Sequence, residues 1–484
     1  MGHEGSFDIN EIVDGQKLRF ASVVFLVITG LVLVSDGFDL AAVGVIAPAL
    51  CKYWQIPTVQ LVPALSASIV GMMMGGALLG ALGDEFGRKR LIIVALALIS
   101  TTTLAAMMAR SASEFTALRF VTGLGLGGVV PNTVALIAEL NPRRSRGRML
   151  VAVATGVIVG TSLPGLAVAM LAPQSGWRPI LLVGGMLPLA VAALAARVLP
   201  ESVKYLVERG DREAEARSIA RRMRPDLEIT DDTRITVPRA APDAGAAKLR
   251  RLFGGDFALV TPLLWITQVA IQMAGFFALT WLPTLLQAGG ASAAQAGINT
   301  SLFAVGGFCS ALVLLFIMDR FGVLPLIFTL LAGVPLVATM TLPGLPAIMH
   351  AVVIAGAGFC VQGAQLVLTV LLGIFYPTAL RSSGTGATLS VGRLGSLAAP
   401  VSGGFLLGMK VQVAYVPLAP ALLLGVGAVA SIILAVVCRR KLDGFRPAEL
   451  DVCDQRAKSY KEPLMSRAMC SLQTAVARSL ERKR

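Results

Sequence analysis

Long apolar runs recur along almost the whole chain, and they constrain its fold more than any other feature. A helix that crosses the hydrocarbon core of a membrane needs about 20 mostly apolar residues. Of the 484 residues, 55% are hydrophobic and only 14% are charged. We therefore expect an all-α membrane protein whose twelve transmembrane helices lie near residues 19–50, 58–82, 90–109, 113–140, 148–172, 177–199, 257–288, 294–318, 322–342, 346–375, 382–408 and 414–438.

One long polar segment divides these helices into two sets of six. The sequence predicts an N-terminal segment (1–18), a six-helix bundle (19–199), a central loop (200–256), a second six-helix bundle (257–438) and a basic tail (439–484). A short repeat relates the two bundles, since residues 84–87 read Asp-Glu-Phe-Gly and residues 319–322 read Asp-Arg-Phe-Gly. Two pseudo-symmetric bundles are the expected architecture.

The formal net charge of +14 comes from basic residues in the loops and the tail. Since they do not gather on one soluble face, we expect no nucleic acid partner. Lys and Arg cluster in alternate loops, as in residues 88–90 and 143–148. The positive-inside rule then predicts that both termini are cytoplasmic. We also expect the protein to be a monomer within the lipid bilayer of the inner (plasma) membrane.

Two carboxylates, Asp36 and Asp39, lie inside the first predicted helix. A charge within the hydrocarbon costs about 2.5–3.5 kcal/mol on insertion scales, so such residues are functional candidates. Their spacing of three places them on nearly the same helix face, and Gly37 leaves room for close approach. The expected counter-charges are Arg119 and Arg393. The alternative is that these four residues only neutralise one another and fix helix packing.

The same four residues are suited to moving an organic anion with a proton. A carboxyl group in low dielectric favours its protonated form, whereas a nearby Arg favours the charged form, so an acid can switch as its partner moves. A guanidinium can hold a carboxylate through two hydrogen bonds. We assign proton coupling to Asp36 and Asp39, with Asp39 as the first choice, and substrate binding to Arg393 or Arg119.

The loop between the second and third helices carries a recognisable motif. Residues 80–90 read Gly-Ala-Leu-Gly-Asp-Glu-Phe-Gly-Arg-Lys-Arg. This segment resembles the G-x-L-x-D-x-x-G-R-R/K signature of the major facilitator superfamily. The resemblance implies a cytoplasmic latch in which Asp84 and Arg88 join Glu139 and Arg148.

Four further segments make the chain similar to the aromatic acid:proton symporter family, the permeases for benzoate and hydroxybenzoates. They are residues 36–40 (Asp-Gly-Phe-Asp-Leu) with 47–50, residues 200–202 (Pro-Glu-Ser), residues 281–286 (Trp-Leu-Pro-Thr-Leu-Leu), and residues 376–378 with Arg381 and 392–395. The resemblance extends from about residue 8 to 440. By this resemblance we expect the charged residues Asp36, Asp39, Arg119, Glu139, Asp319, Arg381 and Arg393 to matter for uptake, with Asp319 and Arg381 in gating. Leu324 stands where family members often have a histidine, which weakens the second latch.

The predicted function is proton-coupled import of an aromatic carboxylate by alternating access. For the ring we expect apolar contact and stacking with Phe38, Phe276, Phe277 and Trp281. No cofactor is expected beyond the proton gradient, and the chain shows no metal or nucleophile–base pattern of an enzyme. Two alternatives remain open: the same fold with another cargo (an aliphatic organic acid, a sugar or a drug), or a transporter-like sensor that signals through its tail.

Overall fold

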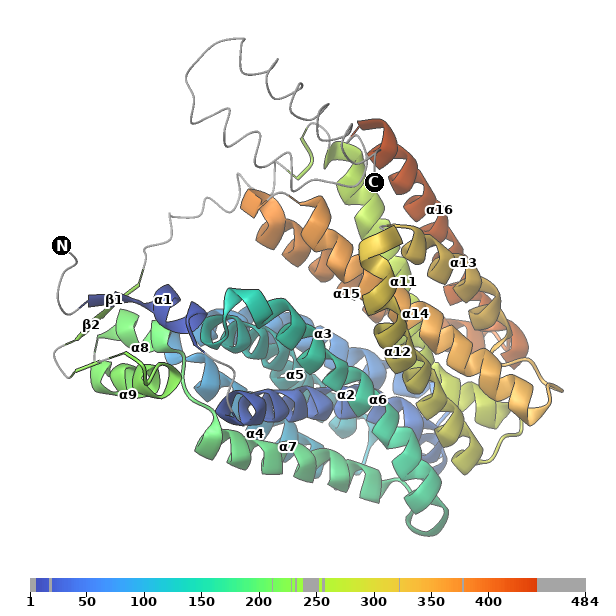
Figure 1. The fold of residues 1–484 in the computed structure, drawn as a ribbon. Helices are drawn as coiled ribbons and strands as arrows, with labels where there is room; N and C mark the ends of the chain where they lie inside the picture. Colours follow the sequence, from blue (N-terminus) through green and yellow to red (C-terminus); the bar gives the residue numbers. More distant parts are fainter. Residues whose placement is uncertain are drawn as a thin grey trace.

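The computed structural model describes residues 6–16, 20–210, 212–227, 229–230, 233–237, 252–254, 257–321, 323–376 and 378–441. The predicted basic tail (439–484) lies outside this part from residue 442 onward. Figure 1 shows two bundles of long helices, with a small group of short elements beside the N-terminus.

The prediction of twelve transmembrane helices is confirmed. The first bundle holds α2 (Phe20–Trp54), α3 (Val62–Phe86), α4 (Arg88–Ala106), α5 (Ala112–Leu140), α6 (Arg143–Ser175) and α7 (Arg178–Val198). The second holds α11 (Phe257–Ala288), α12 (Ala293–Phe321), α13 (Leu324–Thr339), α14 (Ala347–Phe375), α15 (Thr378–Gly408) and α16 (Leu418–Lys441). Ten of these are long and apolar enough to cross a membrane; α13 is shorter, and α15, with 31 residues, is more polar.

Local sequence explains where several of these helices begin and end. Ser111 caps α5, because its hydroxyl accepts a hydrogen bond from the backbone N–H of Glu114. The turn from α3 to α4 depends on Gly87, whose φ of 98° is readily adopted only by glycine. Two short 3-10 turns, Thr58–Leu61 and Val413–Tyr415, lie before α3 and α16. Short loops with such signals connect successive helices that run in opposite directions.

The two bundles pack in the same pattern, as the predicted repeat requires. In the first bundle the main helix pairs are α3 with α5, α2 with α6, α4 with α5, and α4 with α7. In the second bundle the corresponding pairs are α12 with α14, α11 with α15, α13 with α14, and α13 with α16. Each pair of the second bundle joins helices that hold the same places in their set of six as the helices of the corresponding pair in the first bundle. The internal pseudo-symmetry is therefore present in the packing as well as in the loop motif.

Glycines bring paired helices into backbone contact. A Cβ atom at Gly37 of α2 would overlap the carbonyl of Val157 in α6, and one at Gly160 of α6 would overlap the carbonyl of Val34. Small residues permit this approach, which is a common basis of helix association in lipid. The room that the sequence predicted at Gly37 is thus occupied by α6.

The two bundles contact each other mainly through α2 with α11, α6 with α12, and α3 with α15. The closest approaches lie near the ends of these helices that are remote from the chain termini: Gly44 meets Leu279, Gly165 meets Gly297, and Gly404 meets Val62. The hydroxyl of Ser301 in α12 also donates to the carbonyl of Ser162 in α6, at 2.6 Å. From this end the bundles diverge toward the end at which α2 begins and α16 ends (Figure 1).

The N-terminal segment and the central loop fold together, which the sequence did not predict. Strand β1 (Ser6–Asp8) pairs in parallel with β2 (Arg234–Thr236), and the helices α1 (Ile9–Asp14), α8 (Val203–Arg209) and α9 (Glu213–Met223) lie beside them. Ile12 of α1 is fully buried in this group. Asp14 accepts a hydrogen bond from the backbone N–H of Arg143, and Gln16 donates to the carbonyl of Leu140. These contacts attach this group of short elements to the loop between α5 and α6.

Candidate functional site within the membrane helices

Asp36 and Asp39 are both buried in α2, with side chains 2% and 1% exposed. They lie on the same side of the helix, as their spacing predicts, but they do not share a partner. Asp39 points to the first bundle's own helices α4 and α5. Asp36 interacts electrostatically with Arg393 of α15, in the second bundle. The paired acids therefore belong to two different charge pairs.

Asp39 forms a closed, two-pronged ion pair with Arg119 of α5. The Nη1 atom of Arg119 lies 2.9 Å from Oδ1 of Asp39, and its Nη2 atom lies 2.6 Å from Oδ2. Thr103 of α4 donates a further hydrogen bond to Oδ1, at 3.2 Å. Both charged side chains are almost completely buried, at 1% and 2% exposure. A bidentate pair of this kind is strong, and it leaves neither carboxylate oxygen of Asp39 without a donor.

Asp36 and Arg393 form a much looser pair. Within the part of the chain that the structure describes, neither residue makes a side-chain hydrogen bond or an ion pair of 4.0 Å or less, and Oδ1 of Asp36 is buried without a partner. Arg393 is half-buried, in the middle of α15. Burying a charge without hydrogen bonds is costly. This pair is therefore the part of the site that can gain a proton or an anionic ligand.

Amide and hydroxyl side chains lie near the segment of α15 that carries Arg393. Gln268 of α11 packs against Gly392, the residue before Arg393, and its Nε2 atom donates to Oε1 of Gln365 in α14, at 3.3 Å. Ser396 follows Arg393 by one helical turn, and its buried hydroxyl has no partner among the described residues. The sequence reasoning missed these residues. The available signal was the presence of glutamines within apolar spans.

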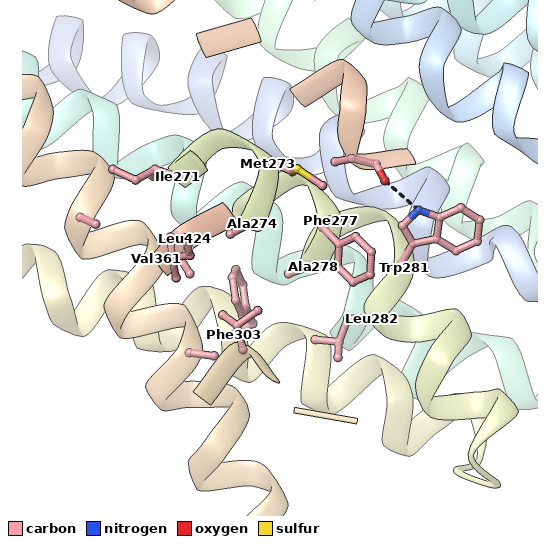
Figure 2. Packing of buried hydrophobic residues seen from close by; sticks show 14 of the residues in the cluster. Ile271, Met273, Ala274, Phe277, Ala278, Trp281, Leu282, Phe303, Val361 and Leu424 are labelled. Atoms are coloured by element: carbon pink, nitrogen blue, oxygen red, sulfur yellow. Dashed lines mark hydrogen bonds between the residues drawn. The ribbon is translucent and has the colours of Figure 1, made fainter. Parts of the chain in front are cut away.

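The aromatic side chains that were predicted to contact a ring lie in packed positions. Trp281 is fully buried, and its indole N–H donates to the carbonyl of Ala399 in α15, at 3.2 Å (Figure 2). Phe277 is also fully buried, in the packed cluster that Figure 2 shows. Phe38 points toward Gly184 of α7 and is 2% exposed, whereas Phe276 is half-buried. For Trp281, Phe277 and Phe38, contact with a ligand requires a conformation that differs from this one.

At the end of the first bundle where α3 meets α4, three of the four predicted latch residues come together. Arg88 forms ion pairs with Asp84 and with Glu139, the latter at 3.6 Å. Arg148 is exposed and joins no ion pair among the described residues. The side chains of Asp319 and Arg381, predicted for gating from the second bundle, lie outside the part that the structure describes.

Comparison with known proteins identifies the family to which this chain belongs. The family model described as Major Facilitator Superfamily matches residues 29–400. The chain belongs to the major facilitator superfamily. Within it, this facilitator belongs to the aromatic acid permease family. It is 34% identical over 410 residues to a gallate transporter of Pseudomonas putida, a match that covers 84% of this chain and 90% of that one.

Two further relatives support the same family. The facilitator is 34% identical over 429 residues to the 4-hydroxybenzoate transporter PcaK of Pseudomonas putida, covering 88% of this chain and 95% of the relative. It is 28% identical over 410 residues to a benzoate transport protein of Acinetobacter baylyi, covering 83% and 87%. The facilitator is a membrane transporter, and its predicted family is confirmed.

A solved structure confirms the fold. The partially occluded inward open conformation of the xylose transporter XylE from E. coli superposes with a TM-score of 0.65 at 17% identity, covering 84% of this facilitator and 97% of XylE. A second structure, of a D-xylose-proton symporter, gives a TM-score of 0.67. At this identity the likeness establishes the architecture of two six-helix bundles and nothing about the cargo.

One residue beside the turn between α3 and α4 had no predicted role. Glu201, which precedes α8, is 3% exposed and accepts a hydrogen bond from the backbone N–H of Lys89, at 3.0 Å. It therefore satisfies one of the open donors in the first turn of α4 and brings a negative charge to that helix end. From the sequence, Glu201 was identified only as part of a family segment, because its distance from α4 along the chain conceals the contact.

Proposed function

We propose that this facilitator imports an aromatic carboxylate together with a proton across the inner membrane by alternating access. The observation that carries the proposal is the difference between its two buried arginines. Arg119 has both terminal nitrogens engaged by Asp39, whereas Arg393 has no hydrogen bond among the described residues and lies within the electrostatic reach of Asp36. Arg393 is the guanidinium that is available to hold a carboxylate.

The relatives support an aromatic carboxylate as the cargo. The named substrates of three relatives are gallate, 4-hydroxybenzoate and benzoate, and each of these is a benzene ring with one carboxylate. An Arg in a low-dielectric setting selects for an anion, and the planar guanidinium matches the planar carboxylate. The ring would then occupy the space next to Arg393 between the bundles.

Charge balance suggests how the proton and the anion move together. When Asp36 is ionised, it competes with a bound carboxylate for Arg393. A proton on Asp36 cancels this competition, so that the positive charge of Arg393 is left for the substrate. Proton and anion therefore favour each other's binding, and the loss of one promotes release of the other. This logic moves our proposed proton site from Asp39, the first choice from the sequence, to Asp36.

We propose that the structure represents the state that faces the cytoplasm. The bundles meet at the end remote from the termini, and basic loops and both termini mark the opposite end. By the positive-inside rule the basic end is cytoplasmic. The closed end then faces outward, and Gly44, Gly165 and Gly404 are the positions at which it would open.

Uptake by the purified protein in liposomes tests the proposal. The labelled substrates are 4-hydroxybenzoate, benzoate and xylose, each measured with an imposed inward proton gradient and again with an uncoupler. We expect at least one aromatic acid to accumulate, and the uncoupler to abolish accumulation, while xylose does not enter. Accumulation of xylose without either aromatic acid would reject the proposed cargo, and accumulation that survives the uncoupler would reject proton coupling.

A further inference from the structure

A series of hydrogen-bonded polar side chains on α11 and α14 ends at Gly392, the residue before Arg393. Gln268 of α11 is 0% exposed, and its side chain fills the space at Gly392, where a Cβ atom would overlap it. Its Nε2 atom donates to Oε1 of Gln365. Gln365 in turn donates through Nε2 to the hydroxyl of Thr369, at 3.4 Å, and Thr369 is exposed. The series thus runs from an exposed position to a fully buried one.

The direction of these hydrogen bonds leaves an acceptor unused at the buried end. Because Nε2 of Gln268 is turned to Gln365, its Oε1 atom has no hydrogen bond partner, although it is buried. Buried polar side-chain atoms are nearly always paired, and an unpaired acceptor inside a membrane protein is a costly feature to retain. A ligand with a hydrogen bond donor would satisfy it.

The position of this acceptor relative to Arg393 limits the ligand. Gln268 touches the residue that precedes Arg393, so a small ring whose carboxylate is held by Arg393 would lie beside it. Ser396, one turn further along α15, offers a second unpaired polar atom on the same side of the helix. The donor must therefore sit on the ring itself.

We propose that Gln268, held in place by Gln365, recognises a hydroxyl group on the aromatic ring of the substrate. The phenolic O–H donates to Oε1 of Gln268 while Arg393 holds the carboxylate, so that the two residues bind opposite ends of one small molecule. The preferred cargo is then a hydroxylated aromatic acid, and unsubstituted benzoate is a poorer one. This inference rests on the proposed function, which it narrows to a substrate class.

A purely structural role for Gln268 makes a different prediction. If its amide only links α11 to α14, its loss would weaken the transport of every substrate to the same extent. If it binds the ring hydroxyl, its loss would lower the transport of hydroxylated acids alone. An acceptor left unpaired also penalises a ligand that lacks the donor, so removing the acceptor would help benzoate. The ratio of kcat/KM for a hydroxylated acid to kcat/KM for benzoate therefore separates a structural role of Gln268 from a role in recognition.

The test measures kcat/KM for 4-hydroxybenzoate and for benzoate in liposomes with an imposed proton gradient. The wild type should prefer 4-hydroxybenzoate by at least about five-fold. Gln268→Leu should lose this preference, with benzoate transport kept or improved. Gln365→Leu should reduce the preference partly, because Gln268 then loses its orientation.

Gln362→Leu is the matched control, since Gln362 also lies on α14 but packs against Gly307 of α12. It should leave the preference unchanged. Equal transport of both acids by the wild type, or an equal loss for both acids in Gln268→Leu, would overturn the inference while the proposed function stands. If the wild type transports neither acid, the proposed function itself fails. Should Gln268→Leu not fold, the wild-type preference and the Gln365→Leu variant still decide the question.

Discussion

Asp36 and Asp39 stand one turn apart on the same helix, yet their surroundings differ sharply. Asp39 has a donor on each oxygen, with Arg119 on both and Thr103 on one. Among the described residues, Asp36 has an oxygen without a partner, and Arg393, which it faces, makes no side-chain hydrogen bond. The comparison teaches that buried charges in this protein can serve two different purposes. A fully paired charge holds helices together, and an incompletely paired charge is available to bind a proton or a ligand.

Breaking the closed pair should have the largest effect. Asp39→Asn leaves Arg119 buried without its counter-charge, and removing one partner of a buried pair costs about 3–5 kcal/mol. We expect a large fall in thermal stability and in the yield of monodisperse protein, measured by heating followed by size exclusion. The double variant Asp39→Asn with Arg119→Met should recover part of the stability. Full stability and normal transport in Asp39→Asn would contradict the structural role of this pair.

Neutralising the loose pair should leave the fold intact and remove coupling. Asp36→Asn keeps the shape of the side chain and deletes no hydrogen bond that the structure describes. We expect a stability close to that of the wild type, loss of proton-driven accumulation, and continued exchange of labelled for unlabelled substrate. Accumulation that still follows the pH gradient in this variant would show that the proton binds elsewhere.

Changing the other member of the loose pair should act on substrate affinity. Arg393→Lys keeps the positive charge but loses the planar two-pronged geometry, so we expect KM for an aromatic acid to rise by roughly ten-fold or more. Binding measured as ligand-induced thermal stabilisation should weaken in parallel. The matched change Arg178→Lys, at an exposed arginine that contacts Tyr53, should alter neither value. An unchanged KM in Arg393→Lys would assign carboxylate binding to another residue.

The smallest expected effect tests whether the difference between the two charge pairs is specific to this conformation, by weakening the contact that keeps the outer end closed. Ser301→Ala removes the hydrogen bond between α12 and the carbonyl of Ser162, which contributes about 0.5–1.5 kcal/mol to the closed outer end. We expect a modest shift toward the outward-facing state. The measurement is the labelling rate of Thr280→Cys, in a background without other cysteines, by a maleimide that cannot cross the membrane. A labelling rate that does not rise would show that this bond does not hold the outer end closed.

Much of the architecture could be predicted because lipid leaves the backbone few options. Each span must satisfy its own hydrogen bonds, so about 20 apolar residues define a helix, and the predicted ranges agree with α2 to α7 and α11 to α16. The buried charges were also identifiable, since a charged residue in an apolar run is rare. Both arginines that pair with the acids were named in advance.

The pairing itself could not be predicted. A spacing of three residues puts Asp36 and Asp39 on one side of α2, but it does not say that they diverge toward helices of different bundles. For the same reason the sequence could not show that Trp281 would be sealed against α15, or that Gln268 would lie beside Arg393. These facts depend on distances between helices, and composition and periodicity contain no such distances.

The parallel pairing of Ser6 with Arg234 and of Asp8 with Thr236 has a consequence for the order in which the protein is made. A ribosome delivers the first strand more than two hundred residues before its neighbour. In that interval all six helices of the first bundle must be synthesised and delivered to the membrane. The start of the chain therefore waits, unpaired, until the first bundle is complete. Closure of this small sheet then marks the end of one half of the molecule before the second half is built.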